Sequence, residues 1–359
     1  MGVQKIVPVD VLDKQDVWVL FREMAGGEAV DSSDLNHIAR EVAAECGGVP
    51  LVIVTIATGL QNKNQRVWAA RARQLKNSNL QHGILEKKVI AKLELSFNYL
   101  EREESKLLFL LCSLFPEDHN ISVEDLMRYA LGLKMFGDVN TIEEARERTY
   151  DVVSTLTDSF MLLDGSEEGS VKMHDVLRDV AISNLNERYG FKVMAGLKNW
   201  PDTQTFENYS AISLISNDMN ELPRELSAPK LQTLRIQCNS HLQIPDDFFK
   251  GSKDQLIFLE MSGIHFLPIL PPSLQPLSNT LRTLHLTSCK LEDISMIATL
   301  KNLEILSFSG SEIGGIPCNI VELSRLKLLD LTKCKNLISI AADISKLPNL
   351  EELYLQRKF

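Results

Sequence analysis

The sequence predicts an α-helical first half followed by an α/β solenoid of repeats. Apolar residues at helical spacing dominate the first 200 positions, and strand signals there are few. After residue 231 one Leu-x-x-Leu-x-Leu pattern returns at regular intervals. The chain has 359 residues, of which 44% are hydrophobic and 24% charged, so it can bury the cores of two or three globular domains.

The repeat pattern defines the second half of the chain. Its copies begin at Leu231, Leu256, Leu281, Leu303, Leu326 and Leu350, so they are spaced 22 to 25 residues apart. This period lies in the range of leucine-rich repeats, about 20 to 29 residues. A degenerate earlier copy fits around Ile212 and Leu214. The sequence therefore predicts a leucine-rich repeat solenoid.

Strand alternation explains this pattern. The leucines of each short strand point into the solenoid, where only stacked neighbours bury them, and the residues between them point outward. Residue by residue, these outward positions are either solvated or partner-binding, but as a surface we expect a recognition or autoinhibitory face. They are Thr233, Arg235, Gln237, Phe258, Glu260, Thr283, His285, Thr287, Ser307, Ser309, Asp330, Thr332, Glu352, Tyr354 and Gln356.

Short helices are predicted along the first half. Asp31 to Asp34 can cap the second helix, and Pro50, which lacks an N–H, suits the first turn of the third. The predicted helices cover residues 16–24, 35–45, 64–75 and 106–114, with others beginning at 50, 86, 122 and 141.

A hairpin is predicted next. Residues 160–163 and 171–173 flank Asp164-Gly165-Ser166, as two strands joined by a turn would. Several short helices followed by such a hairpin describe a winged-helix domain. The fold class is thus an α-helical bundle plus a winged helix, followed by the solenoid.

Composition excludes several functions. The net charge of −10 disfavours binding to nucleic acid or to anionic membranes. The longest apolar stretch, residues 49–57, is too short to span a bilayer, and no secretory signal follows Met1. The six cysteines form no zinc-like spacing, so no metal site is expected and a reducing compartment such as the cytosol is favoured.

Three short motifs carry a family resemblance. Gly48-Val49-Pro50-Leu51 resembles the GLPL motif of NB-ARC domains, although Val49 stands where leucine is usual. Residues 112–118 look like the motif that opens the winged-helix part in plant members, and Met173-His174-Asp175 is similar to the MHD motif near its end. With the repeats, the order of these motifs resembles plant disease-resistance receptors of the coiled-coil type.

The resemblance implies domains and site residues. It suggests a helical NB-ARC part at 1–100, a winged-helix part at 101–195 and about seven repeats at 205–359 that stop without a capping repeat. In this family the GLPL proline, here Pro50, packs near the adenine of ADP. The MHD histidine, here His174, contacts the diphosphate and holds the resting state closed. Supporting positions are Gly48, Leu51, Met173 and Asp175.

Structural alternatives to these roles stay open. Pro50 after two glycines also fits a plain helix start, and a histidine such as His174 is often a capping or packing residue. No G-x-x-x-x-G-K-[ST] loop or magnesium-binding strand occurs in the sequence. We therefore expect no ATP hydrolysis and weak or no ADP or ATP binding, although full-length relatives are weak ATPases. Relatives carry the missing parts upstream, so we expect Met1 to be internal to a longer product.

The function expected from the resemblance is that of a plant innate immune receptor fragment acting in defence against pathogens. Its repeats would bind a pathogen effector or a guarded host protein and also contact the NB-ARC part. The full-length form would oligomerise and lie in the cytoplasm or peripherally at the plasma membrane, without nucleic acid binding or membrane insertion. The alternative is a protein-binding repeat module, or a truncated product without nucleotide cycling.

Overall fold

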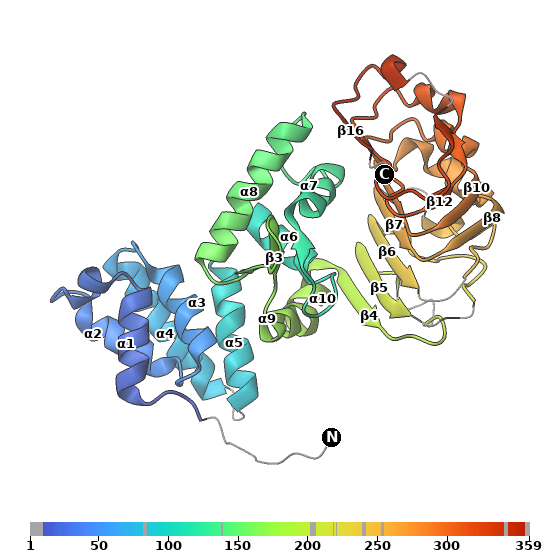
Figure 1. Ribbon diagram of the computed structural model, residues 1–359. Helices are drawn as coiled ribbons and strands as arrows, with labels where there is room; N and C mark the ends of the chain where they lie inside the picture. Colours follow the sequence, from blue (N-terminus) through green and yellow to red (C-terminus); the bar gives the residue numbers. More distant parts are fainter. Residues whose placement is uncertain are drawn as a thin grey trace, which may run out of the picture.

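The computed structural model describes most of the chain and divides it into two halves (Figure 1). We call residues 10–190 the helical half and residues 191–355 the repeat half. Met1 and Gln356, which entered the expectations above, lie outside the described residues. The described residues are 10–81, 85–137, 139–201, 206–217, 219, 221–238, 242–252, 255–340 and 344–355.

Helices α1 to α5 form the first part of the helical half. The Asp13 side chain caps α1 by accepting the N–H of Gln15 at 2.8 Å, and Pro50 occupies the first turn of α3 as predicted. Buried Phe21 meets Trp68 edge-on at 6.0 Å, which ties α1 to α4. The helices are α1 (Lys14–Met24), α2 (Asn36–Glu45), α3 (Pro50–Leu60), α4 (Gln65–Gln81) and α5 (Leu85–Asn98).

The predicted cap of the second helix is wrong. Helix α2 begins at Asn36 after Leu35, which makes no side-chain capping bond. The Asp31 carboxylate instead pairs with the Arg22 guanidinium at 2.5 Å. The carboxylate accepts charge-assisted hydrogen bonds from Arg22, so the acidic side chain turns back toward α1.

The second part of the helical half comprises α6 to α10 and a small antiparallel sheet. The helix starts predicted at 122 and 141 are confirmed: the Ser122 side chain caps α7, and Thr141 forms a capping box with Glu144 on α8. The predicted hairpin is present, because β2 (Leu163–Asp164) pairs antiparallel with β3 (Ser170–Lys172), which also pairs with β1 (Ile121–Ser122). The helices are α6 (Glu103–Cys112), α7 (Val123–Gly132), α8 (Ile142–Asp158), α9 (Asp175–Val180) and α10 (Asn186–Tyr189).

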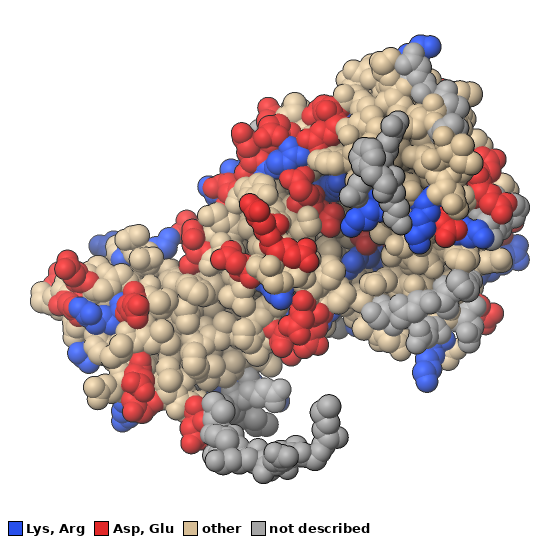
Figure 2. Space-filling model, in the orientation of Figure 1, with Lys and Arg blue, Asp and Glu red and all other residues tan. Residues whose placement is uncertain are grey.

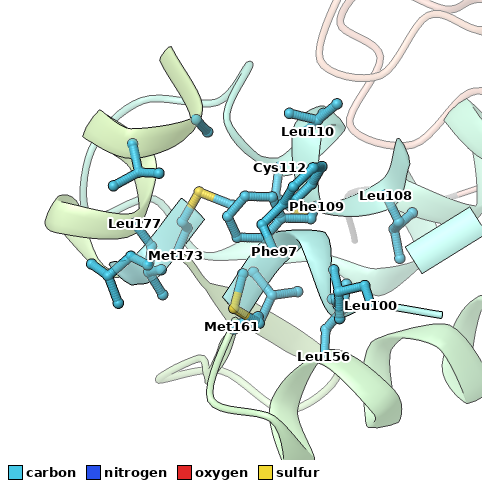
Figure 3. Packing of buried hydrophobic residues seen from close by; sticks show 14 of the residues in the cluster. Phe97, Leu100, Leu108, Phe109, Leu110, Cys112, Leu156, Met161, Met173 and Leu177 are labelled. Carbon is cyan, nitrogen blue, oxygen red and sulfur yellow. The ribbon is translucent and has the colours of Figure 1, made fainter. Parts of the chain in front are cut away.

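One hydrophobic core joins these elements. Figure 3 shows Phe97 of α5 beside Phe109 of α6, with Met161 and Met173 among their neighbours. The two phenyl rings are 5.5 Å apart. Met173 is almost completely buried in this core, so the start of α9 is anchored by packing.

The helical half runs directly into the repeat sheet. Only Gly190 separates α10 from β4 (Phe191–Ala195), which pairs in parallel with β5 (Ala211–Asn217). Gly190 has φ +76°, and its carbonyl accepts the N–H groups of Ser210 at 2.7 Å and Ala211 at 3.0 Å. The connection between the halves is therefore short and hydrogen-bonded.

The repeat half is built on a parallel sheet whose described strands run in the order β16-β14-β11-β9-β7-β6-β5-β4. The predicted repeat register is confirmed: Leu234, Leu259, Leu284, Leu306, Leu329 and Leu353 are successive partners across the sheet. Its later strands are β6 (Thr233–Cys238), β7 (Phe258–Ser262), β9 (Thr283–Thr287), β11 (Ile305–Ser307), β14 (Leu328–Asp330) and β16 (Glu352–Tyr354).

Short strands and 3₁₀ turns complete each repeat. β10 (Lys290–Asp293) pairs in parallel with β8 (His265–Ile269) and with β12 (Glu312–Ile313), and β13 (Gly315–Ile316) pairs with β15 (Ser339–Ile340). Turns such as Ser295–Thr299 and Cys318–Glu322 follow them. Within the described part of the chain, no helix has both the length and the apolar character of a membrane span.

Candidate functional site

The outward face of the repeat sheet is covered by the helical half. We call this contact the docked face; it joins outward residues of β5 to β16 to α7, to α8 and to the turn after α6. Many of the residues predicted to be either solvated or partner-binding are almost completely buried there: Thr233, Arg235, Phe258, Thr283, His285, Ser307 and Asp330. The structure thus shows an intramolecular contact on this face.

The strand register arranges the polar residues of the docked face in one row. Successive partners across the sheet are Ser213, Arg235, Glu260, His285, Ser307, Asp330 and Tyr354. Charges of opposite sign therefore stand side by side on neighbouring strands, where cross-strand pairs interact directly.

Tyr129 of α7 occupies the centre of the docked face. Its ring stacks on Phe258 with centroids 3.9 Å apart, and its hydroxyl donates a hydrogen bond to Glu260. Glu260 also accepts a hydrogen bond from Arg235 Nε at 2.9 Å. Burial, and then the Glu260 charge, raise the pKa of Tyr129 well above its usual value. Burial alone would raise the pKa of Glu260, but Arg235, His285 and Tyr129 outweigh it and the net shift is downward.

A second buried ion pair lies farther along the sheet. Arg128 of α7 contacts Asp330 at 2.8 Å, and Asp330 also accepts the N–H of Thr332 at 2.9 Å and its hydroxyl at 2.7 Å. Burial opposes ionisation of Asp330, yet Arg128 and Thr332 together lower its pKa. Both carboxylates of the polar row are therefore charged and paired, as buried charges must be.

His285 lies between these two ion pairs. It is 6% exposed, and its Nε2 atom has no hydrogen-bond partner among the described residues. Burial, followed by the Arg128 charge, lowers the pKa of His285 to about 4. The imidazole is therefore neutral at pH 7 while the docked face is closed.

Apolar residues form the next part of the contact. Met127 and Leu131 of α7 and Ile142 and Ala145 of α8 cluster with Ile305 and Leu328 of the sheet. Sequence reasoning missed Ile305 and Leu328, although both stand at outward positions in register with Thr283. Two bulky apolar residues at outward positions were the available sign that a neighbouring element covers this face.

Gly132, near the end of α7, allows the close approach. A Cβ atom at this position would overlap the Thr283 hydroxyl and lie 3.1 Å from Thr283 Cβ. The helix backbone therefore touches the sheet through a residue without a side chain.

Figure 2 shows acidic and basic side chains where the two halves meet on the visible side of the molecule. Arg146 of α8 contacts Glu124 at 2.7 Å and Glu352 at 2.7 Å. The N–H of Ile142 donates to Glu351 at 2.6 Å, at the opposite end of the sheet from β5. A cavity of about 140 Å³ lies here, with Arg282, Glu304 and Lys327 in its lining. The rim of the contact is thus polar, and its centre combines stacking with buried ion pairs.

The predicted nucleotide residues lie elsewhere in the helical half. Pro50 is exposed at the start of α3 and Leu51 is partly buried. Gly48 has φ +76°, its carbonyl accepts the N–H of Leu12 at 2.9 Å, and a Cβ atom there would lie 2.7 Å from the Leu12 carbonyl. Glycine at position 48 is therefore required by the backbone, whatever else this motif does.

His174 caps helix α9. Its Nδ1 atom accepts the N–H of Val176 at 3.2 Å, and the side chain is partly buried. Met173 lies in the core and Asp175 is exposed in the first turn. The capping alternative is thus realised. In the described part of the chain, no hydrogen bond or ring contact joins Pro50 to His174.

A larger pocket lies beside the Gly48 motif. It has a volume of about 430 Å³ and is lined by α1, by α2 and by Gly47 and Gly48. Trp18 of α1 and Arg40 of α2 contribute to its wall, and the Arg40 guanidinium lies 4.1 Å from the centre of the Trp18 ring. The guanidinium therefore makes a cation–π contact with the indole in the wall of the pocket.

Comparison with known proteins identifies relatives over nearly the whole chain. A disease resistance protein of Arabidopsis thaliana is 34% identical over 358 residues, which are 97% of this chain and 36% of that protein. A probable disease resistance protein of the same plant is 34% identical over 79% of this chain and 31% of its own length. Disease resistance protein UNI, also from this plant, is 28% identical over 99% of this chain and 38% of its length.

Solved structures resemble only part of the chain. A leucine-rich repeat protein of Leptospira interrogans is 29% identical over 45% of this chain and 41% of its own, with a TM-score of 0.39. This low score adds nothing to the fold, which the strand register establishes directly. The chain matches no protein-family model. It spans 36% of the first relative, and over nearly its own whole length it is similar to plant disease resistance proteins.

Proposed function

We propose that this chain is the regulatory and recognition region of a plant immune receptor, in which the docked face is the closed, resting state. The observation that supports this most is the burial of the outward repeat face against α7 and α8 of the same chain. A partner that binds this face has to displace the helices. Recognition by the repeats and release of the helical half then become one event.

In this proposal the helical half is the second part of an NB-ARC switch, with α6 to α9 and the β2–β3 hairpin as its winged helix. ADP is the proposed resting ligand, with Pro50 near its adenine and His174 at its diphosphate. Because His174 Nδ1 accepts a hydrogen bond, the proton of the neutral ring is on Nε2. That N–H is the donor that a phosphate oxygen requires.

The test of this proposal uses a longer receptor that contains a phosphate-binding loop upstream of these residues. His174→Ala in that receptor should release ADP faster and trigger defence signalling without a pathogen, because one phosphate contact is lost. His37→Ala, which changes an exposed histidine on α2, is the matched control. Unchanged ADP retention together with unchanged silence in the His174 variant would contradict the assignment.

For the chain alone we expect no ATP turnover, since the phosphate-binding loop and the magnesium-binding strand do not occur in its sequence. The measurement is phosphate release by the purified chain. Robust turnover that follows the protein through purification would show that other residues perform phosphoryl transfer.

A second candidate function is a protein-binding repeat module without a nucleotide cycle. Its proposed partner is a pathogen effector or a guarded host protein. Gly132→Leu should open the docked face in the whole chain, because the leucine side chain cannot fit against Thr283. Tighter partner binding by this variant in a nucleotide-free sample would favour the module, while binding that depends on added ADP would favour the switch.

Cytoplasmic location and oligomerisation of the open form in a longer receptor complete the proposal. A fluorescently tagged receptor should distribute through the cytoplasm or along the plasma membrane. Light scattering on the His174→Ala receptor should show larger assemblies than on the resting form.

A further inference from the structure

The turn after α6 is held from two sides. Residues Ser113, Leu114 and Phe115 are 0–3% exposed, and the last two continue the helix end through N–H bonds of Leu114 to Leu111 at 3.0 Å and of Phe115 to Cys112 at 3.2 Å. Their carbonyl groups are therefore out of reach of bulk water and need partners from the protein.

The repeat half holds one of these carbonyls. Leu114 O accepts hydrogen bonds from Ser213 Oγ at 2.8 Å and from Arg235 Nη1 at 3.0 Å. The Arg235 guanidinium also lies 4.3 Å from the centre of the Phe115 ring. Arg235 is the residue that pairs with Glu260, so this turn is part of the docked face.

Helix α9 holds the next carbonyl. Phe115 O accepts a hydrogen bond from Arg178 Nε at 2.9 Å. Arg178 stands one helical turn after His174, and its own N–H donates to the His174 carbonyl at 2.9 Å. The capping histidine and the arginine that reaches the turn are therefore parts of one short rigid element.

We propose that Arg178 is a positioning residue that couples the His174 end of α9 to the docking of the repeats, through the successive carbonyls of Phe115 and Leu114. This inference rests on the proposed function, because it names the route by which the switch would act. If α9 moves away, Arg178 leaves Phe115 O buried without a partner. The turn must then shift to satisfy it, and Leu114 O moves away from Ser213 and Arg235.

The remote N–H of Ile142 provides the measurement. It donates to Glu351 of the repeat half, so its hydrogen exchange in the intact 359-residue chain reports opening of the docked face far from the turn. Arg178→Gln should raise this exchange rate about tenfold, as expected when a hydrogen bond from a charged donor is lost. Arg178→Lys, which keeps a cationic donor, should restore most of the protection.

Arg188→Gln is the matched control. It makes the same change of charge at an exposed residue of α10 and should leave Ile142 unchanged. If Arg178→Gln speeds exchange at Val176 in α9 but not at Ile142, the arginine only stabilises its own helix and the proposal is wrong.

A double-mutant cycle separates coupling from two independent losses. Ser213→Ala removes one bond to Leu114 O and should itself speed exchange at Ile142. If both residues act through the shared turn, the double variant Arg178→Gln with Ser213→Ala should increase the Ile142 exchange rate by clearly less than the product of the two single increases. A result equal to that product would overturn the proposal.

These experiments need no nucleotide, so they distinguish this inference from the proposed ADP switch. Coupling at Ile142 with no effect of His174→Ala on ADP would uphold the route and refute the nucleotide role. Loss of ADP in the His174 variant, with no coupling between Arg178 and Ser213 at Ile142, would support the nucleotide role and refute the route.

Discussion

The two faces of the repeat sheet are both buried, but by different chemistry. The inward face carries a column of leucines, among them Leu259, Leu284 and Leu306, all 0% exposed. The outward face carries a mixed row in which Arg235, His285 and Asp330 are 3–7% exposed. The leucines meet other leucines a repeat away, whereas the polar row meets α7, which lies more than 100 residues earlier in the chain.

This difference separates folding from regulation. Apolar burial is lost when the leucines are exposed to water, and a buried unpaired charge is costly, so the inward face stays closed in the folded solenoid. The outward face depends on paired charges and on a stacked tyrosine, and it can exchange these partners for water when the helices leave. Changes on the inward face should destroy the solenoid, while changes on the outward face should open the contact and leave the solenoid folded.

Leu306→Asp should have the largest effect. An unpaired charge in the leucine column should lower the free energy of unfolding of the repeat half by about 5 kcal/mol. Thermal unfolding followed by circular dichroism measures it. Ile338→Asp makes a comparable change at a side chain that is 89% exposed and should be nearly silent. Equal losses from both would contradict the inward assignment.

Glu260→Gln should be next in size. The substitution leaves the Arg235 guanidinium buried without its counter-charge. This should destabilise the docked state by about 3 kcal/mol. We expect faster hydrogen exchange of the Ile142 N–H, with cooperative unfolding of the repeats retained. Glu322→Gln changes an exposed pair with Lys301 and serves as the control. Collapse of the solenoid in the Glu260 variant would mean that the outward row also supports the fold.

Gly132→Ala tests the close approach of α7. The added methyl group overlaps Thr283, so the docked state should weaken by about 2 kcal/mol even though alanine favours helix. Gly59→Ala, within α3 and with nothing within 4 Å of the added atom, should instead stabilise the chain by roughly 0.5–1 kcal/mol. Hydrogen exchange and thermal unfolding measure both effects. A destabilising Gly132→Ala together with a stabilising Gly59→Ala would show that the contact with the sheet, and not helix propensity, decides the outcome at position 132. A stabilising Gly132→Ala would show that the helix does not touch the sheet there.

Lowering the pH should open the outward face before it unfolds the solenoid. The pKa of His285 is about 4 when docked, against an ordinary value of 6.5, so the open state binds a proton more readily. The docked state is therefore most favoured well above pH 6.5 and weakens as the pH falls toward 4, by on the order of 1 kcal/mol at pH 5.5. The pKa values of Glu260 and Asp330 are also lowered in the docked state, so protonation of these carboxylates at still lower pH should open the face further.

Hydrogen exchange of Ile142 between pH 7.5 and 5, corrected for the intrinsic rate, measures this opening. His285→Gln should flatten the pH dependence. The groups facing His285 are Tyr129 and Arg128 of α7, with Glu260, Asp330 and Arg235 of the sheet. A pH profile that persists without His285 would show that His285 does not control the opening.

The sequence was sufficient for most of the features that local rules determine. The repeat period placed Leu234 to Leu329 in register, the helix predicted to start at Thr141 is capped by that residue, and the hairpin at Leu163 followed from its turn residues. These features depend on neighbours within one turn or one repeat.

Long-range contacts were beyond this reasoning. The Asp31 side chain was assigned to a cap, but it pairs with Arg22, nine residues away. The outward row was expected to be a recognition or autoinhibitory face, yet its partners Tyr129 and Arg128 and the apolar Ile305 could not be matched to it. Pairing between distant elements depends on how two domains pack, which periodicity does not encode.

The short connection at Gly190 has a consequence for any molecule that seeks the outward face. Only one residue separates α10 from β4. Helix α7 therefore stays tethered near the sheet even when its contacts with the docked face are broken. Such a tether is equivalent to an effective concentration on the order of millimolar or higher. A rival ligand of the repeats must therefore outcompete an internal one. A weak ligand would not displace α7, and only a high-affinity or multivalent partner would keep the docked face open.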